Sequence, residues 1–195
     1  DSTGKNDLQT VGNAQISTTQ SKFGGSSLKF NGSTDWLIVP YKNANFPDIT
    51  QAPQFTIECW LYISAYSSNQ GTICGTRLNG SAGWEFRVNS TGTLSIYNTG
   101  GATPVTTTAT VPLNTWTHVA AVKTPTNIAT IYINGVNSAS GTFTNAAVTT
   151  NSMYIGGDGA AADALNGYID DLRITSGVAR YTGNFTPQTS QWQDQ

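Results

Sequence analysis

The chain has 195 residues, of which 10% are charged, and its formal net charge is -2. Soluble domains usually carry roughly 25% charged residues, so we expect a neutral surface rich in hydroxyl and amide groups. The low charge and the lack of any Lys/Arg cluster argue against a nucleic-acid partner. Membrane insertion is not expected either, because no apolar stretch reaches the roughly 18 residues that it requires.

Short segments with alternating apolar residues recur along the chain and predict β-strands. No helical spacing persists, and β-branched Thr, Val and Ile fill the segments. In chain order the expected strands are SLKFN (27–31), DWLIVP (35–40), QFTIECWLYIS (54–64), GTICGT (71–76), GWEFRV (83–88), GTLSIYN (92–98), TWTHVAAVK (115–123), IATIYI (128–133), SMYIGG (152–157) and GYIDDLRIT (167–175).

The turns between these segments have the chemistry of tight hairpins. Asn134-Gly135 follows one strand, and Asn89–Gly92 joins two others, with Asn and Gly tolerating positive φ. Strands joined by short turns without helices cannot be parallel neighbours, so we predict an antiparallel two-sheet sandwich. Sandwiches of this length commonly form one domain, and residues 1–195 are therefore predicted to be a single domain.

The two cysteines lie in consecutive predicted strands. If QFTIECWLYIS turned back through the loop AYSSNQ (65–70) into GTICGT, Cys59 would lie opposite Cys74. Directly opposed cysteines can reach disulfide distance, although such a bond is strained. A disulfide and two buried thiols are both compatible with this hairpin.

Six motifs along the chain resemble those of a known family. They are SKFGGSSLKFNGSTDWLIVP (21–40), FTIECWLYIS (55–64), NTWTHVAAVK (114–123), IYINGV (131–136), SMYIGG (152–157) and LNGYIDDLRIT (165–175). In their order and spacing they resemble the laminin G-like, concanavalin A-like jelly roll. The resemblance covers nearly the whole chain and implies an all-β, two-sheet antiparallel jelly-roll sandwich. The ending GVARYTGNFTP (177–187) is similar to that of such domains in bacteriophage structural and tail proteins, which implies a virion or extracellular location.

Asp170 and Asp171 are adjacent carboxylates inside the last predicted strand. An ionised group in a poorly solvated strand costs several kcal/mol unless it has a partner. One possibility is that Asp171 pairs with Arg173 or Arg180, while Asp170 accepts backbone N–H groups at a bulge.

The resemblance implies the other possibility, a structural Ca²⁺ ion held by the last strand and the N-terminal part of the sandwich. Asp170 or Asp171 would then be a ligand, and Asp1, Asp7 or Asp35 in the loop 31–35 would supply others. Calcium takes six to eight oxygen ligands, which carboxylates, amides and carbonyls provide.

Aromatic and polar side chains outside the family motifs are the candidates for a glycan site. A glycan is recognised by an aromatic ring stacked on the sugar and by amide and hydroxyl side chains in a preformed site. Trp84, Arg87, Tyr66, Tyr97 and Asn98 are the residues that we expect to line such a site. The resemblance, by contrast, makes Trp60 and Trp116 structural residues of the sandwich.

The chain offers little for catalysis. His118 is the only histidine, and no nucleophile motif accompanies it. Glu58 and Glu85, the two glutamates, each lack an acid two positions away, whereas a glycosidase needs two carboxylates about 5 to 9.5 Å apart. We therefore predict that the protein is not an enzyme and that His118 is structural.

These observations predict a non-catalytic carbohydrate-binding or adhesion module on a bacteriophage virion or tail. Its partner would be a cell-surface glycan or other virion proteins. The competing hypothesis is a purely structural virion protein, which decorates a capsid or forms a fibre without binding sugar. A glycoside hydrolase is the least favoured alternative.

Overall fold

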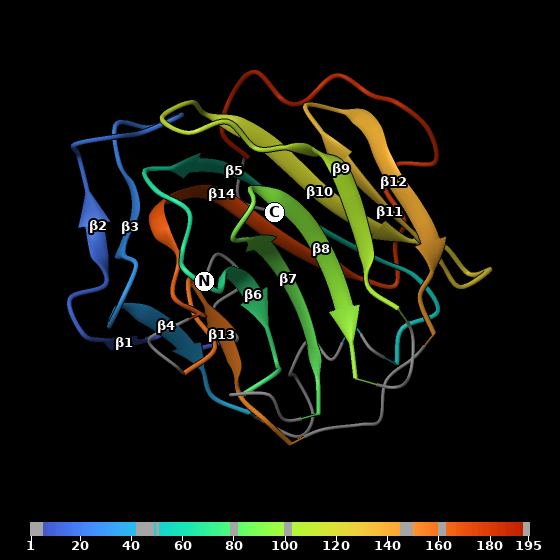
Figure 1. The fold of residues 1–195 in the computed structure, drawn as a ribbon, viewed down its shortest axis with the longest axis horizontal. Coiled ribbons are helices and arrows are strands. Elements are labelled where there is room, and N and C mark those ends of the chain that lie inside the picture. Colours follow the sequence, from blue (N-terminus) through green and yellow to red (C-terminus); the bar gives the residue numbers. More distant parts are fainter. Residues whose placement is uncertain are drawn as a thin grey trace.

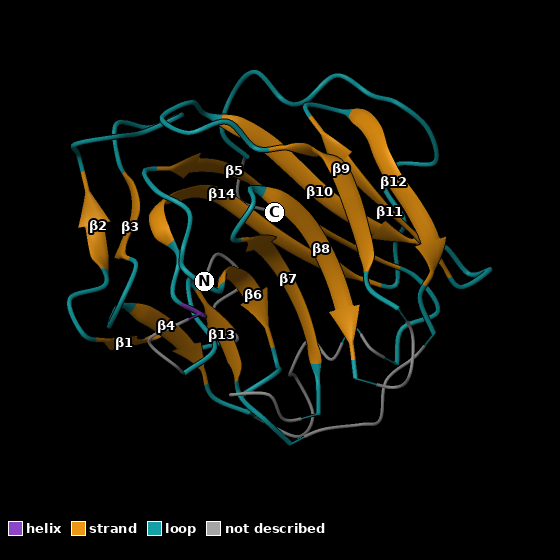
Figure 2. Cartoon of the chain, in the orientation of Figure 1, coloured by secondary structure: helices purple, strands orange, loops and turns teal. Residues whose placement is uncertain are grey.

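The computed structural model describes residues 6–41, 49, 51–78, 82–99, 103–144, 150–159 and 163–192. They form two antiparallel sheets of seven strands each, which lie face to face (Figure 1). Strands and loops make up nearly all of the fold (Figure 2). Within these residues, no helix is long and apolar enough to cross a membrane. The predicted two-sheet antiparallel sandwich is confirmed.

Each sheet contains strands from both the N-terminal and the C-terminal parts of the chain. The order of the first sheet is β1 (Gln9–Val11), β4 (Trp36–Val39), β13 (Met153–Ile155), β6 (Gln70–Gly75), β7 (Trp84–Asn89), β8 (Thr93–Asn98) and β9 (Val105–Thr110). The order of the second is β12 (Val136–Thr142), β11 (Ile128–Ile133), β10 (Thr117–Lys123), β5 (Phe55–Ile63), β14 (Asn166–Ser176), β3 (Ser27–Asn31) and β2 (Gln15–Ser17).

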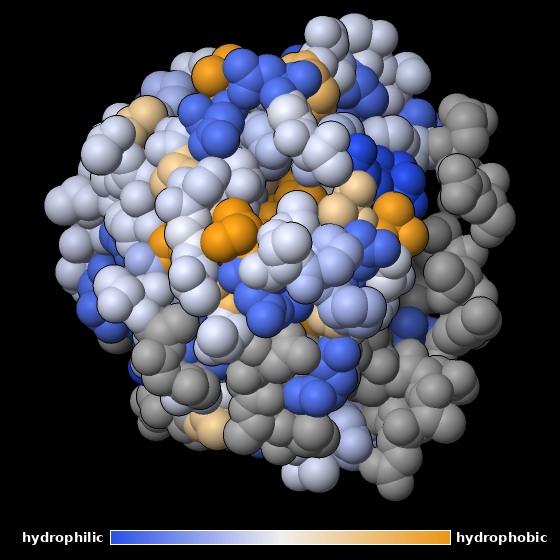
Figure 3. Space-filling view, turned by 90° about the vertical axis from the view of Figure 1, so that its right-hand side faces the viewer, coloured by the Kyte–Doolittle hydropathy of each residue, from blue (hydrophilic) through white to orange (hydrophobic). Residues whose placement is uncertain are grey.

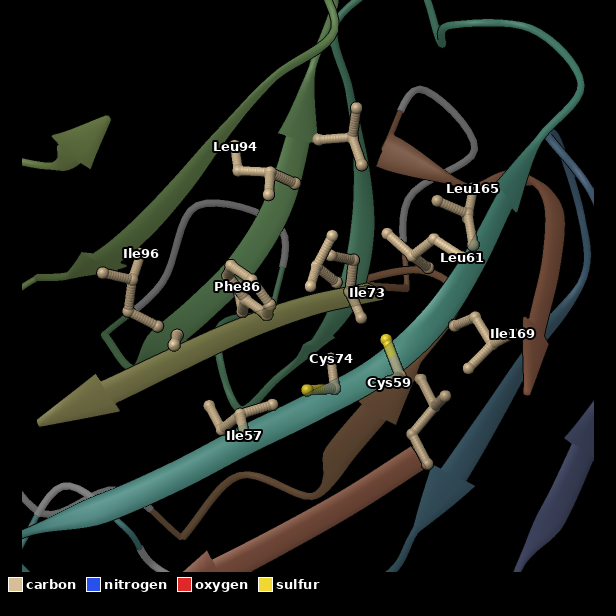
Figure 4. Close-up of a cluster of buried hydrophobic side chains, with 14 of the residues drawn as sticks. Ile57, Cys59, Leu61, Ile73, Cys74, Phe86, Leu94, Ile96, Leu165 and Ile169 are labelled. Carbon is tan, nitrogen blue, oxygen red and sulfur yellow. The ribbon is translucent and has the colours of Figure 1, made fainter. Parts of the chain in front are cut away.

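The core lies between the sheets and follows from the alternation of side chains along each strand. Cys59 and Leu61 of β5, in the second sheet, point into the core. There they face Ile73, Cys74 and Phe86 of the first sheet (Figure 4). All five side chains are fully buried. Burying a large apolar side chain stabilises the fold by about 1.5–3 kcal/mol, so this layer holds the two sheets together.

The predicted hairpin of the two cysteine-containing strands is wrong. β5 pairs with β10 and β14 in the second sheet, whereas β6 pairs with β13 and β7 in the first. The loop between β5 and β6 therefore crosses from one sheet to the other. Cys59 and Cys74 are free thiols that project into the core from opposite sheets (Figure 4). Burial raises the pKa of both thiols, and the buried-thiol alternative is the correct one.

The predicted tight turns are confirmed. Asn134 and Gly135 have φ of 49° and 76° and connect β11 to β12. Gly92, with φ of 84°, closes the turn between β7 and β8. A Cβ atom on Gly135 would collide with the carbonyl oxygen of Phe185, so only glycine lets the C-terminal segment pass this turn.

The C-terminal segment, residues 178–192, packs on the outer surface of the second sheet. Tyr132 of β11 contacts Tyr181 and Phe185 of this segment, and the latter two rings stack with centroids 3.5 Å apart. The backbone N–H of Phe185 donates to the carbonyl of Gly135 at 2.9 Å. The outer surface of β10 and β11 is therefore a second buried layer.

Lys22 and Phe23 extend this cover over β5. The ring of Phe23 meets Trp60 edge-on at 5.9 Å, and the ammonium group of Lys22 lies 3.9 Å from the centroid of the Trp60 ring. The Cζ atom of Arg173 lies 3.4 Å from the centroid of the Trp192 ring. We call the outer surface of β5, β10, β11 and β14 beneath Lys22–Phe23 and residues 178–192 the covered face.

The covered face explains why β5 carries bulky side chains in both directions. Cys59 points into the main core, whereas Trp60 and Tyr62 point outward. Trp60 is 7% exposed, as its predicted structural role requires. Trp116 is half-buried beside Tyr62, with ring centroids 5.6 Å apart.

Candidate functional site

The outer surface of β6–β9 carries a group of polar and aromatic side chains. Trp84 and Phe86 of β7 point into the core, so Glu85 and Arg87 point outward. In the β7–β8 register, Glu85 is opposite Tyr97. We call Arg77, Glu85, Arg87, Tyr97 and the outward polar side chains of β6–β9 the arginine face.

Glu85 lies at the centre of the arginine face and has no exposed surface. Its Oε2 atom accepts hydrogen bonds from Nη1 of Arg77 at 3.2 Å and from Nη1 of Arg87 at 3.1 Å. Its Oε1 atom accepts from Nε2 of Gln70 at 3.1 Å and from the hydroxyl of Thr72. Both oxygens therefore accept hydrogen bonds, and this carboxylate fixes the positions of the side chains around it.

Tyr97 supports both arginines from the neighbouring strand. The Cζ atoms of Arg77 and Arg87 lie 5.4 and 5.5 Å from the centroid of its ring. A cation above an aromatic face is attracted by the ring quadrupole. The Nε of Arg87 also donates to Oδ1 of Asn89 at 3.2 Å. The two arginine side chains are 20% and 17% exposed, so both are partly open to solvent.

A chain of amide and hydroxyl groups leads from Arg87 to the edge of the sheet. Nδ2 of Asn89 donates to the hydroxyl of Thr93 at 2.9 Å and to that of Ser95 at 2.8 Å. The hydroxyls of Ser95 and Thr106 lie 2.7 Å apart. Since adjacent strands are about 4.8 Å apart, this polar track spans on the order of 10 Å from β7 to β9.

Thr106 also lines a cleft between the edge strands of the two sheets. The cleft has a volume of about 560 Å³, with Thr103–Thr106 on one side and Ala139–Thr142 on the other. Figure 3 shows the molecule from the side on which β9 and β12 lie, where hydrophobic patches are small and separated by hydrophilic residues. The arginine face and this cleft therefore adjoin through Thr106.

The structure brings together two of the five residues predicted to contact a glycan. Arg87 and Tyr97 meet on the arginine face. The prediction for Trp84 is wrong, because its ring is fully buried in the core and cannot stack on a ligand. Its spacing from Phe86 and Val88 is the signal that could have placed it in the core.

Tyr66 and Asn98 hold loops and do not line the arginine face. The hydroxyl of Tyr66 donates to the carbonyl of Val111 at 2.7 Å, and no described contact joins it to Arg87 or Tyr97. Asn98 is 1% exposed, and its amide donates to the carbonyl of Thr144. Their predicted place beside Arg87 and Tyr97 is therefore wrong.

Two members of the arginine face were not among the predicted binding residues. Arg77 follows β6 at a position whose approach to β7 no local pattern reveals. Glu85 alternates with Trp84 and Phe86, and this alternation does place it on the same face as Arg87.

Asp170 accepts hydrogen bonds from backbone N–H groups, which was one of the two predicted alternatives. Its Oδ2 atom accepts from the backbone N–H groups of Lys22 at 2.8 Å and Phe23 at 3.0 Å. Its Oδ1 atom accepts from the N–H of Asp171 at 2.9 Å. The β14–β5 register shifts between Asp170 and Arg173, and Asp171 there has φ of 49°. The bulge therefore aims Asp170 at the N-terminal segment.

Asp171 does not pair with an arginine. Its Oδ2 atom accepts from the N–H of Trp192 at 3.1 Å. Arg173 is paired with Glu58, and Nε of Arg180 donates to the hydroxyl of Thr175. Burial raises the pKa of the Asp171 carboxyl above its ordinary value, and the neighbouring Asp170 charge adds to this.

The predicted calcium ligands do not come together. Asp35 is buried, and its Oδ1 accepts from the N–H of Asn13 at 2.8 Å. The β14–β3 register places Asp170 near the start of β3, whereas Asp35 follows the end of β3. Over the part of the chain that is described, which includes Asp7 but not Asp1, no three His, Cys, Asp or Glu residues form a group that could hold a metal. Asp170, Asp171 and Asp35 therefore do not fit a shared calcium site, and calcium binding stays a prediction.

Glu58 is the counterpart of Glu85 on the covered face, and it too has no exposed surface. Nε and Nη2 of Arg173 donate to its Oε1 atom at 2.9 and 2.6 Å, and the hydroxyl of Tyr181 donates to Oε2 at 2.7 Å. Nε2 of His118, which is fully buried, lies 3.5 Å from the same Oε2. This single histidine is enclosed in the covered face.

The environment of Glu58 shifts two pKa values. Burial alone would raise the pKa of its carboxyl, but the nearby His118, the hydrogen bonds from Tyr181 and Arg173 and the charge of Arg173 outweigh it and lower the pKa below its ordinary value. Burial and the hydrogen bond to Glu58 raise the pKa of Tyr181 to about 12. The network therefore keeps Glu58 ionised and Tyr181 protonated as donor.

The fold and the polar outer surface of β6–β9 define a lectin-like β-sandwich. Residues 31–180 match the Laminin_G_3 family model, described as the concanavalin A-like lectin/glucanases superfamily. The chain belongs to this family, and the resemblance inferred from the sequence motifs is confirmed. No protein of curated function matches the chain in sequence.

Solved structures share the fold at low sequence identity. Domain 4 of AbnA, a GH43 extracellular arabinanase from Geobacillus stearothermophilus solved with arabinotriose, is 23% identical, with a TM-score of 0.67 over 91% of this chain and 86% of that one. The binding domain of Paraclostridial mosquitocidal protein 1 is 17% identical, with a TM-score of 0.69 over 88% of this chain and 44% of that one.

A botulinum neurotoxin type C structure, from work on its entry into cells through two ganglioside molecules, is 16% identical. Its TM-score is 0.63 over 87% of this chain and 43% of that one. This chain thus spans less than half the length of both toxin structures.

Proposed function

We propose that this protein is a non-catalytic carbohydrate-binding or adhesion module that holds a saccharide on the arginine face. The observation that carries the proposal is the meeting of Arg77, Arg87 and Tyr97 over Glu85, next to a track of amide and hydroxyl groups. Sugar hydroxyls need such donors and acceptors, and an aromatic side chain supplies apolar contact.

The arginine face is preformed, which favours binding. Glu85 fixes both arginines, and Asn89 is held by Ser95 and Thr93. A ligand therefore has to immobilise few side chains, and the entropy cost of binding is small. Beyond Thr106, the cleft between β9 and β12 offers room for a saccharide chain to continue.

Structures of the same fold support the ligand class. The arabinanase domain was solved with arabinotriose, and the neurotoxin structure belongs to work on entry through gangliosides. Both ligands are carbohydrates or carry them, and the lectin-like family of this chain agrees with such a role.

The placement of the two glutamates supports a function without catalysis. Glu58 and Glu85 lie on the outer faces of opposite sheets, with the whole core between them. Each is saturated by donors, so neither is free to act as acid, base or nucleophile. A glycosidase requires two carboxylates about 5 to 9.5 Å apart across the scissile bond.

The setting that we propose is the surface of a bacteriophage virion or tail, or another extracellular location. The resemblance of residues 177–187 to the ends of such domains in phage structural proteins supports it, as does the sparsely charged composition. The partner would be a cell-surface glycan, with other virion proteins anchoring the module. Mass spectrometry of purified particles checks this setting, since the protein should copurify with them.

A glycan array read with three proteins tests the proposed function. The natural protein should bind a subset of glycans, and Tyr97→Ala should weaken binding about tenfold or more because the arginines lose their support. Tyr62→Ala is the matched control, because Tyr62 is a half-buried tyrosine on the other sheet. Thermal unfolding should show that all three proteins are folded.

Two results would contradict the proposal. If no glycan binds while the protein forms stable assemblies with particle proteins, the purely structural role is the right one. If Tyr62→Ala weakens binding and Tyr97→Ala does not, the glycan site lies on the second sheet.

A further inference from the structure

The arginine face has an unbalanced charge. Arg77 and Arg87 both pair with the same Oε2 atom of Glu85, at 3.2 and 3.1 Å. Among the described residues these are the only ion pairs that the two arginines make, so one positive charge is left over. The other carboxylate oxygen is taken by Gln70 and Thr72 and cannot neutralise it.

Both guanidinium groups also have donors to spare. Arg87 uses Nε and Nη1, and its Nη2 has no hydrogen bond to any described residue. Arg77 uses only Nη1, so its Nη2 has no hydrogen bond to any described residue either; its Nε is buried and is not available to a ligand. An arginine presents five N–H donors in a planar fork that matches the oxygens of an anion.

The two like charges are held near each other by the protein itself. They share one oxygen of Glu85 and one ring, that of Tyr97. Holding two guanidinium groups together costs free energy from their repulsion, and a bound anion relieves this repulsion. Because both side chains reach solvent, an anion can approach them from outside.

We infer that the saccharide bound by the arginine face is anionic and carries a carboxylate or sulfate group on its sugar ring. The anionic group would accept hydrogen bonds from the Nη2 groups of Arg77 and Arg87. The rest of the sugar would lie over Tyr97 and along the track through Ser95 and Thr106. This inference rests on the proposed saccharide site and adds its chemical class.

Calorimetry with matched saccharides tests the inference. The probes are oligogalacturonides, the same oligosaccharides after methyl esterification, and a sulfated chondroitin oligosaccharide. An acidic probe should bind at least about tenfold more tightly than a neutral one, because hydrogen bonds to charged groups are strong. Raising the salt concentration should weaken the acidic probe selectively. Which acidic probe binds separates carboxylate from sulfate recognition.

Variants connect this preference to the two arginines. Arg87→Gln should remove most of the preference for the acidic probe, and Arg87→Lys should retain part of it, because lysine keeps the charge but lacks the planar fork. Arg180→Gln is the control, since Arg180 contacts Thr175 on the other sheet, and it should change nothing.

The outcomes separate this inference from the proposed function. Equal affinity for the acidic and esterified probes, or binding only to neutral glycans on the array, overturns the anionic ligand but leaves a glycan-binding module. An acidic preference that persists in Arg87→Gln and Arg77→Gln also overturns it. Failure of every glycan to bind overturns the proposed function itself.

Discussion

The covered face and the arginine face each stabilise a buried glutamate, but they do so with different parts of the chain. Each places a fully buried glutamate on the outer surface of a sheet and holds it with arginine. Around Glu58, the C-terminal segment adds Tyr181 and closes the site. Around Glu85, the donors come from β6 and β7 and from Arg77 directly after β6.

The difference shows what a buried charge can be used for. On the covered face the charge network fastens one part of the chain to another. On the arginine face a similar network holds two arginines with one carboxylate; these side chains are 20% and 17% exposed, about as much as the 20% of Arg173. A buried glutamate is therefore no sign of a site by itself; the arginine face differs in having a second arginine whose charge the glutamate cannot neutralise.

The largest expected effect is that of Glu58→Ala, compared with Glu85→Ala. Removing Glu58 leaves Arg173 and Tyr181 without their acceptor and His118 without its charged neighbour beneath the C-terminal segment. Breaking a buried ion pair in this way costs about 3–5 kcal/mol. Glu85→Ala should cost less, because its partners all lie in or next to β6 and β7, whereas Glu58 also holds Tyr181 of the C-terminal segment. Urea unfolding of both variants measures the difference, and equal losses would mean that the covering segment is irrelevant.

Asp170→Asn should destabilise the covered face to a lesser degree. The amide can replace only one of the two acceptor oxygens that hold Lys22, Phe23 and Asp171. Loss of hydrogen bonds to a charged group costs about 1.5–3 kcal/mol. Urea unfolding should show the same loss with and without a chelator. A loss that disappears after chelation would show that Asp170 acts through calcium.

A smaller effect is expected from pH. The folded pKa of Glu58 is lowered relative to its ordinary value of 4.5, so its contribution to stability is complete above that value. The contribution is lost as pH falls through the folded pKa. Glu58→Gln should therefore flatten the fall in stability below pH 4.5, followed by urea unfolding at several pH values. If the free energy of unfolding of Glu58→Gln falls in acid as steeply as that of the natural protein, other carboxylates cause the fall.

The smallest effect is expected from Asp171→Asn. Burial raises the pKa of this carboxyl, so its ionised form costs stability above the ordinary pKa. Asn removes the charge, tolerates φ of 49°, and still accepts from the N–H of Trp192. We expect a gain below about 1 kcal/mol at neutral pH, since solvent screens this site. The gain should vanish in acid; a loss at neutral pH would mean that the charge itself is needed.

Local patterns in the sequence determined much of the fold. Alternation in QFTIECWLYIS and GWEFRV marks strands with one face in the core, and Asn134-Gly135 marks a tight turn. The family motifs then identify the sandwich. The four edge strands β1, β2, β9 and β12 were not predicted; β1 and β2 have three residues each, and β9 and β12 are rich in Thr, Ser and Gly and lack alternating apolar residues.

The sequence by itself placed Arg87 and Tyr97 among the binding candidates, but only the tertiary structure brought them together with Arg77. It also decided that β5 pairs with β10 and β14, which separates Cys59 from Cys74. The physical reason is that the sequence pattern reports only interactions between residues close together in the chain. The side-chain alternation of a strand is local, whereas its partners, and what covers its outer face, depend on contacts between residues far apart in the chain.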